Sequence, residues 1–369
     1  MRLVSVVMVA ALAGCGRGPI VEASSIDLHR RAIQGGALDS TSTAVVSVLL
    51  TDGSTTWVCS GSLIAPNLVL TAQHCVADSP SADCVSSNQF GAAWSTSSFV
   101  VTTSASASAT HYRRGTFPTV DNATWFGVRA VWTPGRTFCG DDMALLELST
   151  AISGVCPLVP RVDQAVTDGE TYSAVGFGAL SPTDDSAGTR YRVGGMSVTC
   201  AAQCGSDAHP TREWEGGASD ARGGCSGDSG GPALDSQGRI IGTLSRGTED
   251  TCNDSTYASV AGLATWLRQQ ALVAAADGNY TAPGWAMGQP TSGTSGCSGT
   301  GGGSGAGGGS GAGGGSGAGG GSGATPIVLF HAKAEGPAAK SGCTSVEVLN
   351  LWSWLGVITT LRRRRTSVP

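Results

Sequence analysis

Between Gly223 and Pro232 the chain reads GGCSGDSGGP, and this stretch decides how the rest of the sequence is interpreted. Its Ser229 is surrounded by glycines, which tolerate positive φ and carry no Cβ to hinder a closely approaching substrate. The stretch therefore predicts a sharp turn that presents Ser229 as a nucleophile. It also fits the G-x-S-x-G pattern, which occurs on more than one fold, so the surrounding motifs have to distinguish between folds.

Two motifs upstream supply the partners that a serine nucleophile needs. The chain reads TAQHC up to Cys75, with His74 inside it, and DMALL from Asp142 onward. Together with GDSGGP, these segments resemble the histidine, aspartate and serine segments of the chymotrypsin-like serine proteases, with Gln73 and Met143 at two positions where other residues are more usual. The order His, Asp, Ser is that of this family, whereas esterases of the α/β-hydrolase type have the order Ser, Asp, His.

The resemblance implies a catalytic triad of His74, Asp142 and Ser229. His74 would take the proton of the Ser229 hydroxyl, and Asp142 would hold the imidazole in the required tautomer. The backbone N–H groups of Gly227 and Ser229 would form the oxyanion hole. The family needs no cofactor and no metal. Taken singly, His74 could be a core or surface residue and Asp142 a turn residue, but three motifs in the right order argue against coincidence.

The resemblance also places four residues around the pocket for the side chain that precedes the cut: Gly223, Ser245, Gly247 and Ser255. Trypsin-like members carry an aspartate at the position of Gly223, so the sequence predicts cleavage after apolar, bulky residues instead. Arg246 stands where the family usually has an aromatic residue, and it could fold over the pocket. Glu249 or Asp250 could reach the pocket with a carboxylate if their loop differs from that of the family.

The fold expected from this sequence is all-β. From residue 44 to about 260, short runs rich in Val, Leu, Ile and Thr alternate with Gly, Pro, Asp and Ser, which is typical of many short strands joined by turns. The resemblance implies two six-stranded antiparallel β-barrels with the site between them. Residues 260–276 carry apolar side chains at helical spacing and predict a C-terminal helix. The resemblance covers residues 33–276, which we take as the protease domain.

The start of this domain suggests activation by cleavage. The chain reads IQGG from Ile33, which resembles the mature N-terminus of these proteases. In the family, the freed amine turns inward and pairs with the aspartate before the nucleophile, here Asp228; an unpaired buried carboxylate would be costly. An activating protease is therefore an expected partner. Arg30 and Arg31 would attract a trypsin-like activator, but release of Ile33 requires a cut after Ala32.

Twelve cysteines indicate an oxidising compartment rather than the cytosol. By resemblance, Cys59 and Cys75 would bridge the histidine loop, and Cys225 and Cys252 would close the pocket wall. Five other cysteines do not map onto family bridges: Cys84, Cys139, Cys156, Cys200 and Cys204. Because five is an odd number, one of them is free or pairs outside the domain with Cys297 or Cys343.

The N-terminus predicts export. Arg2 precedes an apolar run, Leu3–Ala13, which has the length of a signal-peptide core and is too short to span a bilayer. The run leads into LAGC at Cys15, which resembles a bacterial lipoprotein box, where the cysteine is acylated; an ordinary signal peptide is the alternative. We expect residues 1–15 to be the signal, residues 16–32 a tether or propeptide, and the protein to lie at the bacterial envelope or surface or to be secreted.

The C-terminal part has a different composition. Residues 277–342 are expected to form a Gly/Ser-rich flexible linker, because its GGGSGA repeats cannot bury a core. Residues 343–369 combine Cys343, an apolar stretch and the cluster Arg362 to Arg365, which resembles bacterial C-terminal surface-sorting tails. The alternative is a poorly ordered tail lying on a membrane surface.

Charge excludes one class of function. Only 13% of the residues are charged, and the net charge of −5 arises from scattered signs, so we expect no nucleic-acid partner. The sequence predicts a serine endopeptidase that acts on proteins or peptides. The rival is an inactive protease homologue that binds peptides without cutting them. Loss of a triad residue would favour that rival, and all three are present.

Overall fold

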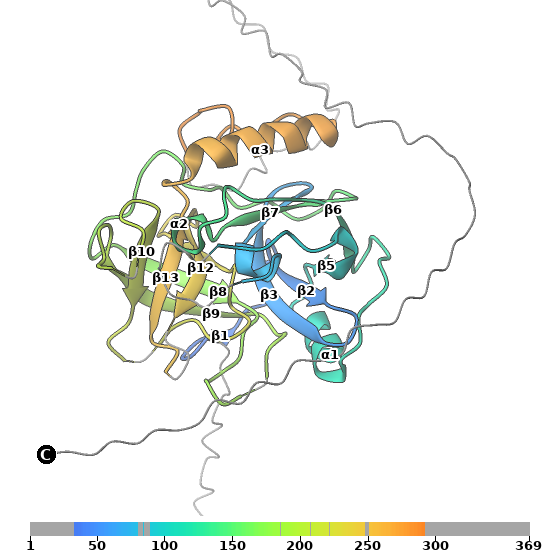
Figure 1. The fold of residues 1–369 in the computed structure, drawn as a ribbon, viewed down its shortest axis with the longest axis horizontal. Helices are drawn as coiled ribbons and strands as arrows, with labels where there is room; N and C mark the ends of the chain where they lie inside the picture. Colours follow the sequence, from blue (N-terminus) through green and yellow to red (C-terminus); the bar gives the residue numbers. More distant parts are fainter. Residues whose placement is uncertain are drawn as a thin grey trace, which may run out of the picture. The chain divides into compact units, whose positions relative to one another are not determined.

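The structure is a computed structural model, and it describes residues 33–79, 84, 89–184, 186–206, 208–220, 222–247 and 251–291. The expected signal, the tether and the tail after residue 291 lie outside the described residues. So do several single residues of interest: Cys15, Glu249, Asp250, Cys297 and Cys343. The described part of the chain consists mainly of strands, as the sequence predicts (Figure 1).

The N-terminal half forms a closed antiparallel barrel of six strands. Their order around the barrel is β2-β3-β4-β7-β6-β5. Val48, Leu63 and Leu146 lie in its core, because β-branched and leucine side chains fit a pleated, half-buried surface. The strands are β2 (Val45–Thr51), β3 (Thr56–Ala65), β4 (Leu68–Thr71), β5 (Phe99–Thr102), β6 (Phe126–Trp132) and β7 (Ala144–Leu148).

A second barrel of six strands follows, so the expectation of two six-stranded barrels is confirmed. Its order is β9-β10-β13-β12-β11-β8, closed by the pairing of β8 with β9, and β1 (Ala37–Leu38) adds to β9. Trp214 and Tyr257 stack in its core with ring centroids 4.3 Å apart. The strands are β8 (Thr171–Gly176), β9 (Tyr191–Cys200), β10 (Glu213–Gly217), β11 (Pro232–Leu234), β12 (Ile240–Gly247) and β13 (Asp254–Ser259).

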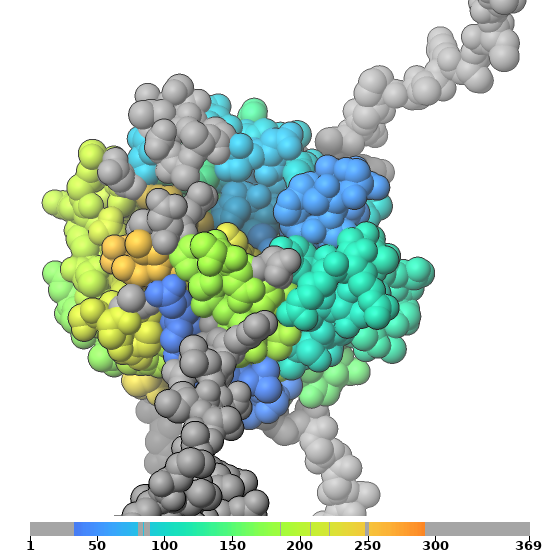
Figure 2. Space-filling view, turned by 90° about the horizontal axis from the view of Figure 1, so that it is seen from below, coloured from blue at the N-terminus to red at the C-terminus, as the bar shows by residue number. Residues whose placement is uncertain are grey.

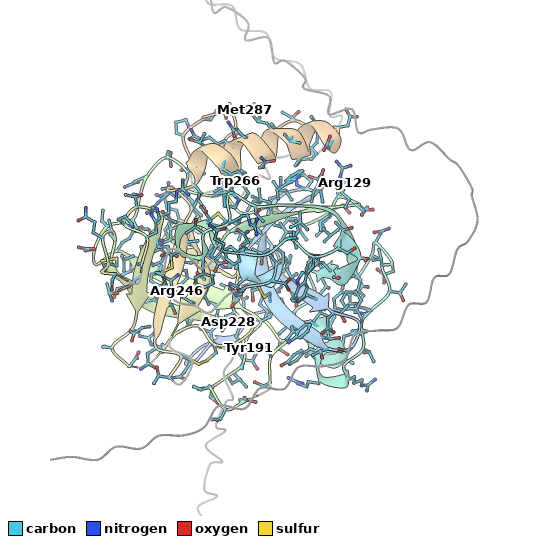
Figure 3. All side chains as sticks on the ribbon, viewed as in Figure 1. Arg129, Tyr191, Asp228, Arg246, Trp266 and Met287 are labelled. Carbon is cyan, nitrogen blue, oxygen red and sulfur yellow. A yellow bond between two sulfur atoms is a disulfide. The ribbon has the colours of Figure 1, made fainter. Side chains whose placement is uncertain are left out.

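The expected C-terminal helix is present as α3 (Ala264–Asp277), which begins later than predicted because residues 260–263 form a turn. Figure 1 shows it beside β6 and β7. Arg129 of β6, labelled in Figure 3, joins Glu147 and Asp277 at 2.6 Å each, which fixes the end of the helix. The remaining helical segments are short: α1 (Ala107–Arg114), α2 (Phe138–Asp141), η1 (Gln73–Cys75) and η2 (Thr96–Ser98). Within the described ranges, no helix has the length and apolarity needed to cross a bilayer.

The packed part of the chain continues beyond this helix, which corrects the expected start of the flexible linker. Residues 278–291, the C-terminal strap, lie against the barrels. Trp285 is only 4% exposed, and the Tyr280 hydroxyl donates to Asn67 Oδ1 at 2.7 Å. Thr291 Oγ1 donates to Asp163 Oδ1 at 2.5 Å. The boundary at residue 276 was wrong because the two aromatic anchors are hidden in a composition that otherwise resembles a linker.

We expect Tyr280→Phe to lower the free energy of unfolding by about 1 to 2 kcal/mol, because it leaves the buried Asn67 Oδ1 without a partner. Asn67→Ala should cost more, since Asn67 also donates to Glu147 and to the Ala274 carbonyl. Urea titration of the full chain measures both. Tyr112→Phe is the control, because the Tyr112 hydroxyl makes no hydrogen bond within the described residues. Equal stability of all these proteins would show that the hydrogen bond between Tyr280 and Asn67 contributes nothing.

Candidate active site

The site is built on a buried carboxylate that receives donors from both barrels. Asp142, directly after α2, is fully buried. His74, in η1, donates its backbone N–H to Asp142 Oδ1 at 2.9 Å, and its Nδ1 lies 2.8 Å from Oδ2. Ser245 of β12 donates its hydroxyl to Oδ2 at 2.6 Å. Three donors therefore fix the carboxylate, which in turn orients the imidazole of His74.

The protonation states of this pair follow from two opposing effects. Burial disfavours the charged form of both groups, but their mutual attraction and hydrogen bond prevail. The pKa of Asp142 is lowered from its ordinary value, and the pKa of His74 is raised. The positive charge of Arg246 works against the second shift, because it disfavours a protonated imidazole. His74 is thus placed to accept a proton and to hold it as an imidazolium stabilised by Asp142.

Ser229 lies on the turn before β11, next to the segment that carries His74. Ser60 of β3 donates its N–H to the Ser229 carbonyl at 2.8 Å. Gly230 has φ +82°, and a Cβ there would lie 2.2 Å from Thr71 Oγ1, so only glycine fits after the serine. In the described residues Ser229 Oγ makes no hydrogen bond to His74. Such contacts are often long before substrate binds and tighten afterwards.

The same turn offers two backbone donors. The N–H groups of Asp228 and Gly230 donate to carbonyls, at 3.0 and 2.8 Å respectively. In contrast, the N–H groups of Gly227 and Ser229 have no acceptor within the described part of the chain. Gly227 has φ +96°, and its carbonyl accepts the Ser60 hydroxyl at 2.9 Å, which fixes the peptide. Two unpaired donors next to a serine form a site suited to a negatively charged oxygen.

A second buried carboxylate, that of Asp228, belongs to the same turn. It accepts hydrogen bonds from the N–H groups of Gly178 at 2.7 Å and Cys225 at 2.9 Å. Gly178 makes room for it, since a Cβ at that position would lie 2.4 Å from the Asp228 Cγ. Burial raises the pKa of Asp228 to about 7 in spite of the two donors. Among the described residues no cation pairs with Asp228.

The segment that starts at Ile33 is already inserted into the second barrel. Ile33 is 1% exposed in the barrel core, and Gln34 donates its N–H to the Gly223 carbonyl at 3.0 Å. Figure 2 shows the blue N-terminal segment among green and yellow-green residues of the second barrel. Ile33 has φ +48°, which is a strained conformation for a β-branched residue.

Three of the four predicted pocket residues come together. Gly247 and Ser255 face each other across β12 and β13, and the Ser255 hydroxyl accepts the Gly224 N–H at 3.4 Å. A Cβ at Gly223 would lie 2.1 Å from the Cys252 carbonyl oxygen, so this position has no room for an aspartate unless the backbone moves. The hydroxyl of Ser245, the fourth residue, points to Asp142 instead.

Arg246 is held by a residue that sequence reasoning missed. Its guanidinium forms a bidentate ion pair with Glu213 of β10, at 2.7 and 3.1 Å. Nothing in the local sequence of Glu213 points to this role, because the two residues meet only through the pairing of β10 and β12 with β13. The hydrogen bond from the Ser245 hydroxyl to Asp142 was also missed, because the sequence assigned Ser245 to the pocket.

Disulfides join several segments of the described chain. Cys59–Cys75 and Cys225–Cys252 are present, as expected. Cysteines without an expected partner form the bridges Cys84–Cys139 and Cys200–Cys204. Cys156 is disulfide-bonded too. Since the other described cysteines are all paired, its partner lies outside the described residues.

Metal binding can be tested on the same side chains. Two groups of ligand-type residues come close together in the described ranges: Cys59, His74 and Cys75, and Cys84, Cys139 and Glu213. In both groups the cysteines form a disulfide and offer no thiolate, and the thiolate is the form that binds metals. Neither group fits a metal ion.

Comparison with known proteins gives two findings. The model of the trypsin family matches residues 33–267, which is more than half of the chain. A solved structure described as "Structure of GrC" is similar to 64% of this chain and to 99% of its own, with 21% sequence identity and a TM-score of 0.49.

The raised pKa of Asp228 predicts a pH-dependent stability in the uncleaved chain. Asp228 titrates near its ordinary value of 3.8 when unfolded and at about 7 when folded, so stability present below the unfolded value is lost as the pH rises toward 7. Asp228→Asn cannot ionise. We expect urea titrations between about pH 4 and 7 to show wild type losing stability relative to Asp228→Asn. Curves that stay parallel over this range would contradict an unpaired buried carboxyl.

Proposed function

This chain belongs to the trypsin family of serine endopeptidases, and we propose on that basis that His74, Asp142 and Ser229 cleave peptide bonds in protein or peptide substrates. One observation carries this assignment. The N–H groups of Gly227 and Ser229, which have no acceptor among the described residues, lie at the nucleophile Ser229. The imidazole of His74 is oriented by the buried carboxylate of Asp142. A peptide-binding homologue would need neither the free donors nor the orienting carboxylate.

The reaction follows from these positions. Ser229 Oγ attacks the carbonyl carbon of the scissile bond and passes its proton to His74 Nε2. The N–H groups of Gly227 and Ser229 receive the negative charge that develops on the carbonyl oxygen. His74 then gives its proton to the leaving amine, which departs and leaves an acyl-enzyme. A water molecule, deprotonated by His74, hydrolyses this ester and regenerates Ser229.

For the residue before the cut we propose an apolar, bulky side chain. The lack of space for a carboxylate at Gly223 supports this preference, as does the neutral hydroxyl of Ser255, which is 1% exposed. No carboxylate of the described residues is placed to pair with a lysine or arginine side chain at Gly223 and Ser255, and burying such a charge unpaired is expensive.

We also propose activation by an unidentified protease that cuts before Ile33. The new amine would give Asp228 the cation that it lacks, which would lower the pKa of Asp228 and hold the adjacent turn. Cutting would also relieve the strain at Ile33, because the carbonyl oxygen that restricts its φ would be gone. The burial of Ile33 and the bond from Gln34 to Gly223 support this step.

Export and membrane attachment remain proposals from the sequence. We propose that the protein is exported and attached through an acylated Cys15, through residues 343–369, or through both. The LAGC motif and the arginine cluster support these two routes.

We expect protein cleaved before Ile33 to hydrolyse peptides with Phe, Tyr, Leu or Ala before the cut, and Ser229→Ala to abolish hydrolysis. A panel of peptides differing only at that residue measures both. Preference for Arg or Lys would keep the mechanism and refute the proposed pocket. No hydrolysis by a folded protein with a free Ile33 amine would favour the peptide-binding homologue.

Activation has its own test. N-terminal sequencing of the active protein should give Ile33 as the first residue. Asp228→Asn in the cleaved protein should lower kcat/KM by roughly 100-fold or more, the scale of losing an oxyanion donor, because the amine would lose its partner. An active form that starts elsewhere, or an Asn variant of undiminished activity, would contradict the pairing.

A further inference from the structure

Glu213 is a buried carboxylate whose acceptor positions are all used. It is 1% exposed, and Figure 3 labels its partner Arg246. Besides the two bonds from Arg246, it accepts the N–H of Gly140 at 3.0 Å and the N–H of His209 at 2.6 Å. A buried charge is tolerated when it is both paired and hydrogen-bonded in this way. Glu213 is therefore a rigid anchor rather than a residue available to substrate.

This anchor holds the catalytic aspartate from two sides. Gly140 lies two residues before Asp142, so its bond to Glu213 fixes the backbone that leads into the aspartate. Arg246 directly follows Ser245, the residue that donates to Asp142 Oδ2. Arg246 Nη1 lies 3.3 Å from Ser245 Oγ. Because the guanidinium can only donate, it occupies a lone pair of that oxygen and leaves the hydroxyl hydrogen for Asp142.

The guanidinium of Arg246 is also confined by its neighbours. Its Cζ lies 5.7 Å from the centroid of the Phe138 ring, within the range of a cation–π contact. Its Nη2 lies 3.3 Å from the Sγ of Cys84, which is bridged to Cys139. The side chain is 13% exposed. Its positive charge is thus held in one position.

We propose that Arg246, clamped by Glu213, is a positioning residue that directs the Ser245 hydroxyl onto Asp142 and keeps a fixed positive charge close to His74. This inference deepens the proposed function and rests on the triad assigned there. An aromatic residue, which the family usually carries at this position, could not supply the positive charge.

The charged groups around His74 set the direction of the effect. Asp142, after α2, favours the imidazolium, and Arg246, from β12, disfavours it. Glu213, from β10, offsets part of the Arg246 charge, while Asp141 is paired with Arg212 at 2.6 Å. Arg246 therefore lets His74 become a free base at a lower pH than Asp142 alone would allow.

The two partners of this ion pair should shift catalysis in opposite directions. Arg246→Gln removes a positive charge, so the acid limb of the kcat/KM profile should move to higher pH by about half a unit or more. Glu213→Gln leaves the positive charge uncompensated, so the limb should move to lower pH. Arg246→Lys keeps the positive charge but loses the bidentate contact of the guanidinium with Glu213. The acid limb of its kcat/KM profile should stay in place, while kcat falls roughly three- to tenfold with KM unchanged.

Arg239→Gln is the control, since it breaks an arginine–carboxylate pair, with Asp235, that contacts none of Ser245, Asp142 and His74; its acid limb should not move. The proposal is overturned if Arg246→Gln and Glu213→Gln shift the acid limb in the same direction. Loss of the ion pair alone, without an effect of the Arg246 charge on His74, would act in the same way in both variants. It is also overturned if Arg246→Gln and Arg246→Lys both match wild type. Circular dichroism identifies any variant that fails to fold, and Arg246→Lys is then the decisive comparison.

One readout separates this inference from the proposed function. In full-length Ser229→Ala protein, an NMR titration of the His74 imidazole gives its pKa without any need for hydrolysis. The same opposite shifts are expected for Arg246→Gln and Glu213→Gln in that background. An unmoved His74 pKa in both variants would refute the role of Arg246, whereas absence of hydrolysis in wild type would refute only the proposed function.

Discussion

The buried carboxylate of Asp142 is the constraint on which the arrangement of the two barrels depends. A charge removed from water must be met by donors of its own, and here they come from η1, which follows β4 of the first barrel, and from β12 of the second. The barrels therefore have to meet along the line where His74 and Ser245 approach Asp142. The closed barrels, the Cys59–Cys75 bridge and the glycine turn at Ser229 hold the segments that carry the site in place.

A comparison of the two buried aspartates explains why one supports chemistry and the other suggests a switch. Asp142 has a histidine and a hydroxyl as partners, and its pKa is lowered. Within the described ranges Asp228 has only two backbone donors, and burial raises its pKa to about 7. Asp228 belongs to the turn that carries Ser229, whereas Asp142 lies against His74 and Ser245. The difference in partners, rather than in burial, makes the first a fixed anion and the second a carboxyl that gains most from a new cation.

The sequence was sufficient for features that depend on local motifs. GDSGGP, TAQHC and DMALL predicted the fold and the pairing of His74 with Asp142, because each motif needs its glycines or its neighbouring strand. The ion pair of Arg246 with Glu213 and the bridge Cys84–Cys139 could not be predicted, since each joins segments far apart in the chain. The strap was missed for another reason. Its anchors, Tyr280 and Trp285, stand among Gly, Pro and Thr, and their burial depends on surfaces made elsewhere.

The central claim is that Ser229 is an activated nucleophile, and covalent labelling tests it most directly. A serine oxygen bonds to the phosphorus of a fluorophosphonate and displaces fluoride only when a neighbouring base has made that oxygen reactive. Protein cleaved before Ile33 should be labelled once, on the peptide that contains Ser229, and His74→Ala should abolish the labelling, as read by mass spectrometry. Folded, cleaved protein that stays unlabelled, or that is labelled equally in the His74→Ala variant, would contradict the account.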